Sequence, residues 1–182
     1  MNTTIEKQFE LEEPIEKVWA SLSDPNEIVT CVPGASITQQ IDDTNYKGEV
    51  VTKFGPMKVK YDGDIEILEM DVENHHMKLK GRGLDSKGKG SADMIMNGKL
   101  EESDGKTKVH FTMEISIVGM LAQFGSRLIK DVSDQLLNQF VGNFKSKLAG
   151  EEVDNTMSAG SMMGSMVKSK LGGIFGSKDK DA

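Results

Sequence analysis

The chain has 182 residues, of which 37% are hydrophobic and 28% charged, and its formal net charge is −7 at pH 7. These values are typical of one globular domain with some residues to spare, and they exclude a chain that is disordered throughout or that spans a membrane. The acidic total also argues against a general nucleic-acid binder, because contacts to phosphate require a basic face. The charge is unevenly placed, since residues 1–156 sum to −9 and residues 157–182 to +2.

The first part of the chain predicts a strand followed by two short helices. Apolar and polar residues alternate over residues 4–11, which is typical of a half-buried strand. Pro14 suits a first helical position, and an apolar stripe follows over residues 15–22. Asp24 is a typical N-cap for a second short helix, which we expect to end before Pro33.

Residues 35–118 alternate with a period of two, which predicts strands rather than helices. Clusters of turn-forming residues divide this region at 42–45, 55–56, 71–74, 85–90 and 101–105. We expect about six antiparallel strands with one apolar, covered face and one charged, solvated face.

The covering element is predicted over residues 119–148, which contain no proline. Apolar residues recur there at spacings of three or four, the pattern of an amphipathic helix of about eight turns and roughly 45 Å. The whole pattern predicts an α+β fold in which a curved seven-stranded antiparallel sheet wraps around a long C-terminal helix.

No catalytic or metal site is predicted. The run from residue 83 to residue 90 resembles a phosphate-binding loop, but Gly90 stands where a Ser or Thr is needed, and the run joins two predicted strands. His75 and His76 are adjacent in a predicted strand, so they point to opposite faces and cannot chelate one ion. Cys31 is the single cysteine, so no intrachain disulfide forms, and at a helix C-terminus we interpret it as a buried core residue.

Methionines gather on the predicted inner face and at the start of the long helix. Because methionine is flexible and polarizable, it suits both an irregular core and a promiscuous binding surface, and the pattern leaves both interpretations open. Thr52 and Tyr61 are polar residues on the same face that would orient a carbonyl or hydroxyl group of an apolar ligand. Arg127 is a third candidate, with a solvated or paired arginine as the alternative. The six methionines are Met57, Met77, Met94, Met96, Met113 and Met120.

Five short motifs resemble those of the carbon monoxide dehydrogenase G-subunit family, within the helix-grip superfamily that includes START domains and birch-pollen-allergen-like proteins. The resemblance covers about residues 3–148 and implies a hydrophobic cavity between sheet and long helix. It also implies a small accessory protein of molybdenum-containing CO dehydrogenases or related hydroxylases, attached to the cytoplasmic membrane face and handling a quinone or similar lipid. The motifs are residues 24–25, 31–34, 61–63, 119–122 and 125–129.

On this basis we expect residues 1–149 to form a ligand-binding helix-grip domain. Its cavity is predicted to be lined by residues from the inner strand faces and the start of the long helix. These are Thr52, Phe54, Tyr61, Met77, Leu79, Met94, Met96, Phe111, Met113, Leu121, Phe124 and Leu128.

After a polar linker over residues 150–156, the remaining residues 157–182 show an apolar stripe opposite serines and lysines, the pattern of an interfacial amphipathic helix. The segment is too short to span a bilayer, so we predict docking to a membrane or a partner protein. The alternatives are a disordered tail and a tail folded over the cavity mouth. The docking residues are Met162, Met163, Met166, Val167, Lys168, Lys170, Leu171, Ile174 and Phe175.

The leading functional hypothesis is a non-enzymatic carrier of a quinone or lipid, without a covalently bound cofactor. It would sit in the cytoplasm, peripheral on the inner face of the cell membrane, because the N-terminus lacks the pattern of a secretory signal. Its partners would be an anionic membrane and a molybdenum hydroxylase or CO dehydrogenase, with no nucleic acid. The alternatives are a factor that recruits or matures such an enzyme without a ligand role, and a cyclase-like enzyme on the same fold.

Overall fold

The computed structural model describes residues 1–54 and 56–153, which form one antiparallel sheet of seven strands with helices on one side. The strand order is β1-β7-β6-β5-β4-β3-β2. In chain order the elements are β1 (Asn2–Leu11), α1 (Ile15–Leu22), α2 (Pro25–Ile28), η1 (Val29–Cys31), β2 (Ala35–Gln40), β3 (Asn45–Phe54), β4 (Met57–Asp71), β5 (His76–Asp85), β6 (Gly90–Ser103), β7 (Lys106–Gly119), η2 (Met120–Phe124) and α3 (Gly125–Leu148).

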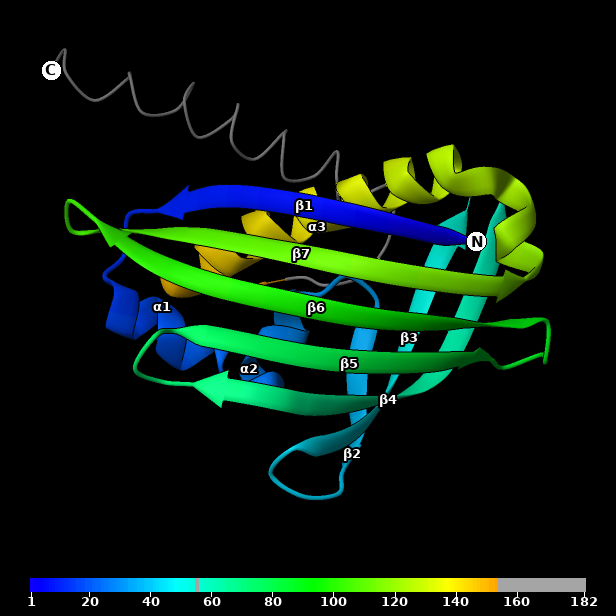
Figure 1. Cartoon of the computed structure of the whole chain (residues 1–182), viewed down its shortest axis with the longest axis horizontal. Helices are drawn as coiled ribbons and strands as arrows, with labels where there is room; N and C mark the ends of the chain where they lie inside the picture. Colours follow the sequence, from blue (N-terminus) through cyan, green and yellow to red (C-terminus); the bar gives the residue numbers. More distant parts are fainter. Residues whose placement is uncertain (55, 154–182) are drawn as a thin grey trace, which may run out of the picture.

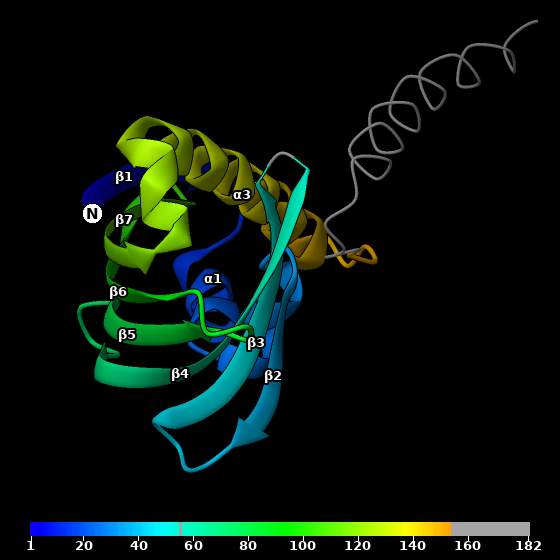
Figure 2. The same ribbon diagram turned by 90° about the vertical axis from the view of Figure 1, so that its right-hand side faces the viewer.

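The sheet curves around α3, with β1 at one edge and β2 at the other (Figures 1 and 2). The predicted helix-grip fold with six strands between residues 35 and 118 is therefore confirmed. The alternation also sets the inner face, because one row of paired residues crosses five strands on the side of α3. That row runs Ile5, Met113, Met96, Leu79 and Ile67.

A row of glycines on the same face allows neighbouring strands to approach closely. Gly48 pairs with Gly63, which pairs with Gly83, across β3, β4 and β5. A Cβ atom at Gly63 would lie 2.4 Å from the carbonyl oxygen of Arg82, a distance that no side chain tolerates. Glycine at this position therefore permits the tight coiling of the long strand β4.

The long helix is shorter than the predicted span of residues 119–148. Residues Met120–Phe124 form a 3-10 helix, and α3 begins at Gly125 and has 24 residues, which gives a length of about 36 Å. Gly125 has φ 79°, a left-handed conformation that interrupts a continuous α-helix. The apolar spacing continues across this break, which is why the sequence pattern predicted one helix.

The hydrophobic core divides into two clusters at opposite ends of α3. The first cluster holds eleven buried residues and lies beneath α1 and η1, whereas the second holds four. The first comprises Leu11, Ile15, Val18, Trp19, Cys31, Met77, Leu100, Val109, Phe111, Phe144 and Leu148, and the second Val59, Ile117, Leu121 and Ile129.

Contacts with the short helices fix the C-terminal half of α3. The Asn143 side-chain amide donates to the backbone oxygen of Cys31 at 3.1 Å, and the Lys147 ammonium donates to that of Glu27 at 3.2 Å. Cys31 is fully buried, as predicted for a small core residue, and burial raises its pKa above the ordinary value. The first cluster is thus closed by packing and by hydrogen bonds.

A candidate ligand-binding interior

The space between the two core clusters is lined by apolar side chains that face α3 without being buried. Phe111 in the first cluster and Ile117 in the second lie on the same strand, six residues and so about 20 Å apart. Five inward-facing residues between the clusters belong to neither cluster's buried set and are only half-buried. These are Ile65, Ile67, Met94, Met96 and Met113.

Gly98 gives a direct measure of open space on this inner face. It lies on β6, paired with Phe111 on one side and Met77 on the other. A Cβ atom built on Gly98 would meet no heavy atom within 4 Å. Well-packed cores leave few such gaps, so the interior has room for a further apolar group where it borders the first cluster.

Thr52 supplies a buried polar atom to the second cluster's end of the interior. Its residue is 6% exposed, and its Oγ1 atom has no hydrogen-bond partner among the described residues. Buried hydroxyl groups are nearly always hydrogen-bonded, because desolvation without a partner is costly. An unsatisfied hydroxyl on an apolar wall is what a site for a ligand carbonyl or hydroxyl would present.

Tyr61 is the second polar residue on this wall, diagonal to Thr52 across β3 and β4, because Thr52 pairs with Val59. The ring is half-buried and packs against the second cluster. Burial, followed by the nearby charge of Asp85, raises the pKa of Tyr61 above the ordinary value of 10.0. The phenol is therefore protonated at neutral pH and can donate a hydrogen bond.

The structure places the other predicted cavity residues in different surroundings. Met94, Met96 and Met113 lie in the half-buried middle, whereas Met77 and Phe111 are buried in the first cluster, against which Leu79 packs. Leu121 is buried in the second cluster. Phe124 and Leu128 are 41% and 36% exposed at the start of α3, where Arg127 is also exposed. Phe54 ends β3, and its side chain lies outside the described part of the structure.

Ile65, Ile67 and Gly98 belong to this interior but were missing from the predicted site. The period-two alternation had already placed both isoleucines on the inner face. Gly98 has no side chain to mark it, and only the register with Phe111 shows its position.

An ion pair on the inner side of β1 ties α3 to the sheet edge. The Lys7 ammonium lies 3.4 Å from the Asp134 carboxylate, with both side chains about one-third exposed at 31% and 36%. At that exposure the pair contributes little to stability and mainly fixes where the helix lies against β1.

The sequence features that resembled catalytic or metal sites have structural roles. Residues 85–90 form the hairpin between β5 and β6, where the Lys89 backbone amide donates to the Asp85 carboxylate. His75 is in the turn before β5 rather than in a strand, with φ 49°, and its ring meets Trp19 edge-on at 5.3 Å. In residues 1–54 and 56–153, no cluster of three His, Cys, Asp or Glu residues is arranged to hold a metal.

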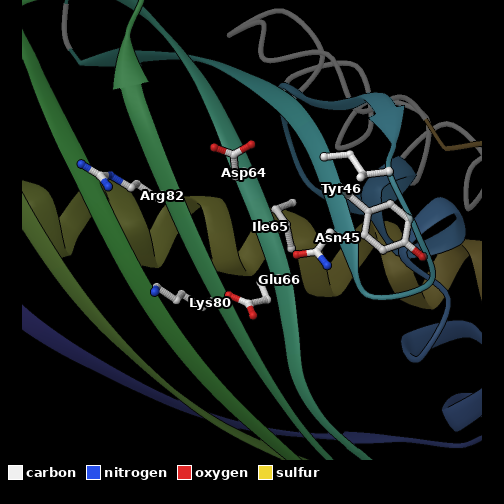
Figure 3. A pocket seen from close by; sticks show the side chains of 8 residues that line it. Asn45, Tyr46, Asp64, Ile65, Glu66, Lys80 and Arg82 are labelled. Carbon is white, nitrogen blue, oxygen red and sulfur yellow. The ribbon is translucent and has the colours of Figure 1, made fainter.

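The opposite, outer face of the sheet carries two shallow hollows of about 230 and 280 Å³ that share Lys80. Figure 3 shows the first, with α3 running behind the strands. Its charges are largely paired within the sheet, since Arg82 lies 3.8 Å from Asp93 and Lys47 lies 3.4 Å from Asp64. These hollows are open and polar, unlike the inner face.

The predicted docking tail, residues 157–182, lies outside the described residues, as do residues 154–156 of the predicted linker. Within the described part of the chain, no helix combines the length and apolar character needed to cross a bilayer.

Comparisons with known proteins agree with this architecture. A conserved protein from Geobacillus kaustophilus is 26% identical, with a TM-score of 0.73 over 82% of this chain and 96% of that one. The ZhuI aromatase/cyclase from a Streptomyces species is 12% identical, with a TM-score of 0.58 over 84% of this chain and 100% of that one. Ara h 8.0201 is 16% identical, with a TM-score of 0.57 over 83% and 100%. The last two show the fold alone, and no curated protein sequence matches.

The family comparison gives the assignment that the short motifs had suggested. The family model of CoxG, the G-type subunit of carbon monoxide dehydrogenase, matches residues 8–149, from β1 through the end of α3. That span contains the whole inner face between the two clusters, including Thr52, Tyr61 and Gly98. The chain therefore belongs to the CoxG family of carbon monoxide dehydrogenase subunits.

Proposed function

We propose that this protein is a non-enzymatic accessory factor that binds an apolar ligand, a quinone or a lipid, between the sheet and α3. The observation that carries the proposal is the half-buried apolar middle of the inner face, bounded by two separate core clusters. Apolar area left accessible inside a fold is unfavourable unless something covers it, at about 25 cal/mol per Å². A ligand that fills this space would therefore gain binding free energy from it.

The polar groups give the ligand its expected chemistry. Thr52 offers an unsatisfied hydroxyl and Tyr61 a protonated phenol on adjacent strands, whereas the surrounding side chains are aliphatic or methionine. This arrangement favours a mostly apolar molecule with an oxygen-bearing head group, because a few placed polar groups usually orient an apolar ligand. Methionines at the middle would adapt to its shape.

Membership in the family supports the partner proposal. A carbon monoxide dehydrogenase subunit acts beside an enzyme, so we propose that this chain serves a molybdenum-containing CO dehydrogenase or related hydroxylase. Docking to the cytoplasmic membrane face through residues 157–182 would bring an apolar ligand close to its source. The absence of a visible acid–base pair on the described inner face favours a carrier over the cyclase-like alternative.

The first test is native mass spectrometry of protein purified from its own host, followed by solvent extraction. The proposal predicts a bound apolar molecule in a defined ratio to protein. Protein that is consistently empty, under conditions in which it is folded, would contradict the carrier proposal.

A cavity-filling variant provides the matched test. Gly98→Leu places a side chain where no atom lies within 4 Å of the Cβ position, so the chain should fold while losing ligand. Gly142→Leu on the exposed side of α3 is the control, since its Cβ also meets no atom within 4 Å. If the partner enzyme works equally well with both variants, recruitment without a ligand role becomes the better account.

A further inference from the structure

One end of the molecule concentrates positive charge although the chain as a whole is acidic. Residues 56–60, 84–90 and 118–130 contain six Lys or Arg residues and one acidic residue, a net charge of +5, against −7 for the whole chain. The remaining described surface is correspondingly more acidic. We name the surface formed by these three segments the loop end.

Hydrogen bonds show that the three segments meet at one place. The Ser86 amide donates to the Lys60 carbonyl at 2.9 Å, and the Met120 amide donates to the Lys89 carbonyl at 2.9 Å. The segments thus join the start of β4, the β5–β6 hairpin and η2. Figure 2 looks directly at this end of the molecule.

The basic side chains of the loop end are available to a partner. Lys60 is paired with Glu49 at 2.8 Å. The other five basic side chains are exposed and form no ion pair with any residue in the described part of the chain. They are Lys58, Lys87, Lys89, Arg127 and Lys130.

Exposed apolar side chains accompany these charges. Val118 is 61% exposed, Leu84 55%, Phe124 41% and Leu128 36%, which makes half of the exposed large hydrophobic residues of the described chain. Cations flanking exposed apolar groups are typical of surfaces that bind the interface of an anionic bilayer. An acidic protein partner would pair the same lysines but would not by itself account for the protruding apolar side chains.

We infer that the folded body itself docks on an anionic phospholipid bilayer through the loop end, independently of residues 157–182. The inference rests on the proposed function for its purpose, because an apolar ligand would enter or leave at the docked end. The second cluster adjoins this end and has only four buried residues, against eleven at the other end, so the interior is less firmly closed here.

The test measures partitioning of the full chain onto phosphatidylcholine vesicles with and without phosphatidylglycerol. Lys87→Gln with Lys89→Gln should weaken binding to the anionic vesicles roughly 25-fold, because each basic residue near such a surface contributes roughly fivefold. Lys99→Gln with Lys108→Gln, toward the other end of β6 and β7, changes the net charge equally and should have little effect. Equal losses in both variants, or no loss in the first, would overturn the inference.

Hydrogen exchange on vesicle-bound full chain locates the contact. Protection is expected in residues 84–90 and 118–130, and protection confined to residues 157–182 would contradict docking by the body. Ligand content of the Lys87→Gln, Lys89→Gln protein is measured in parallel. Retained ligand with lost vesicle binding supports the inference, whereas protein without ligand that still binds vesicles would count against the carrier proposal alone.

Discussion

Replacing Thr52 with valine should stabilise the ligand-free protein, the opposite of the usual effect of changing a buried residue. The substitution removes the Oγ1 atom, which has no hydrogen-bond partner in the described structure, and keeps the shape of the side chain. An unsatisfied buried polar group costs about 1–3 kcal/mol, so the free energy of unfolding should rise by up to that amount. For a domain of this size the melting temperature would rise by roughly 2–12 °C.

The matched control is Thr107→Val. Thr107 is also buried, but its hydroxyl donates to the Glu13 carbonyl at 2.8 Å. The same chemical change there breaks a satisfied hydrogen bond and leaves a buried carbonyl without its donor, so it should destabilise the protein by about 1–3 kcal/mol. Opposite signs at the two threonines are expected in urea denaturation of ligand-free protein.

The ligand-bound protein should respond in the reverse sense. If the Thr52 hydroxyl donates to the ligand, valine removes one hydrogen bond worth about 0.5–1.5 kcal/mol and weakens affinity roughly 2- to 12-fold. Thermal shift with and without extracted ligand measures both effects on one sample. Destabilisation of the ligand-free Thr52→Val protein, similar to that of Thr107→Val, would refute the reasoning, because the hydroxyl would then have a partner of its own.

Three further substitutions test the packing and the charge network. Phe144→Ala, at a fully buried ring in the first cluster, should cost about 3–5 kcal/mol in urea denaturation, and a cost below about 1 kcal/mol would show a loose core. Gly63→Ala should destabilise the protein, because its Cβ would meet the Arg82 carbonyl, whereas Gly142→Ala in α3 should stabilise it by about 0.5–1 kcal/mol. Backbone hydrogen bonds hold the pKa of Asp42 below its ordinary value of 3.8, so its contribution to stability is present above that pH and is lost as the pH falls further. The acid limb of the stability curve should be shallower in Asp42→Asn, and an identical limb would contradict this assignment.

The sequence predicted the sheet well because period-two alternation is a local property. Ile67 and Leu79 could be placed on the inner face before their pairing was known, and the structure pairs them there. The start of the long helix was predicted wrongly, since Gly125 adopts a left-handed conformation inside an unbroken apolar period. Nothing in the spacing of the apolar residues distinguishes that break from a continuous helix.

The candidate site was harder to predict, because burial depends on which elements cover each residue. Met77 and Met96 have the same inner-face pattern, yet Met77 is 8% exposed in the first cluster while Met96 remains half-buried. The difference lies in the position of α1 and of the second half of α3 over one end of the sheet. Only the assembled structure shows that the covering ends before the middle.

The most direct test of the proposed interior is methyl NMR of the full chain carrying ¹³C-labelled methionine, titrated with a short-chain quinone and separately with a lysophospholipid. The chain has 12 methionines, and they lie on both sides of the proposed boundary. The account predicts that one of the two probes shifts the methyl signals of Met94, Met96 and Met113 in a saturable manner and leaves that of Met77 nearly unchanged. If neither probe shifts these three signals, the interior between the two clusters is not a ligand site.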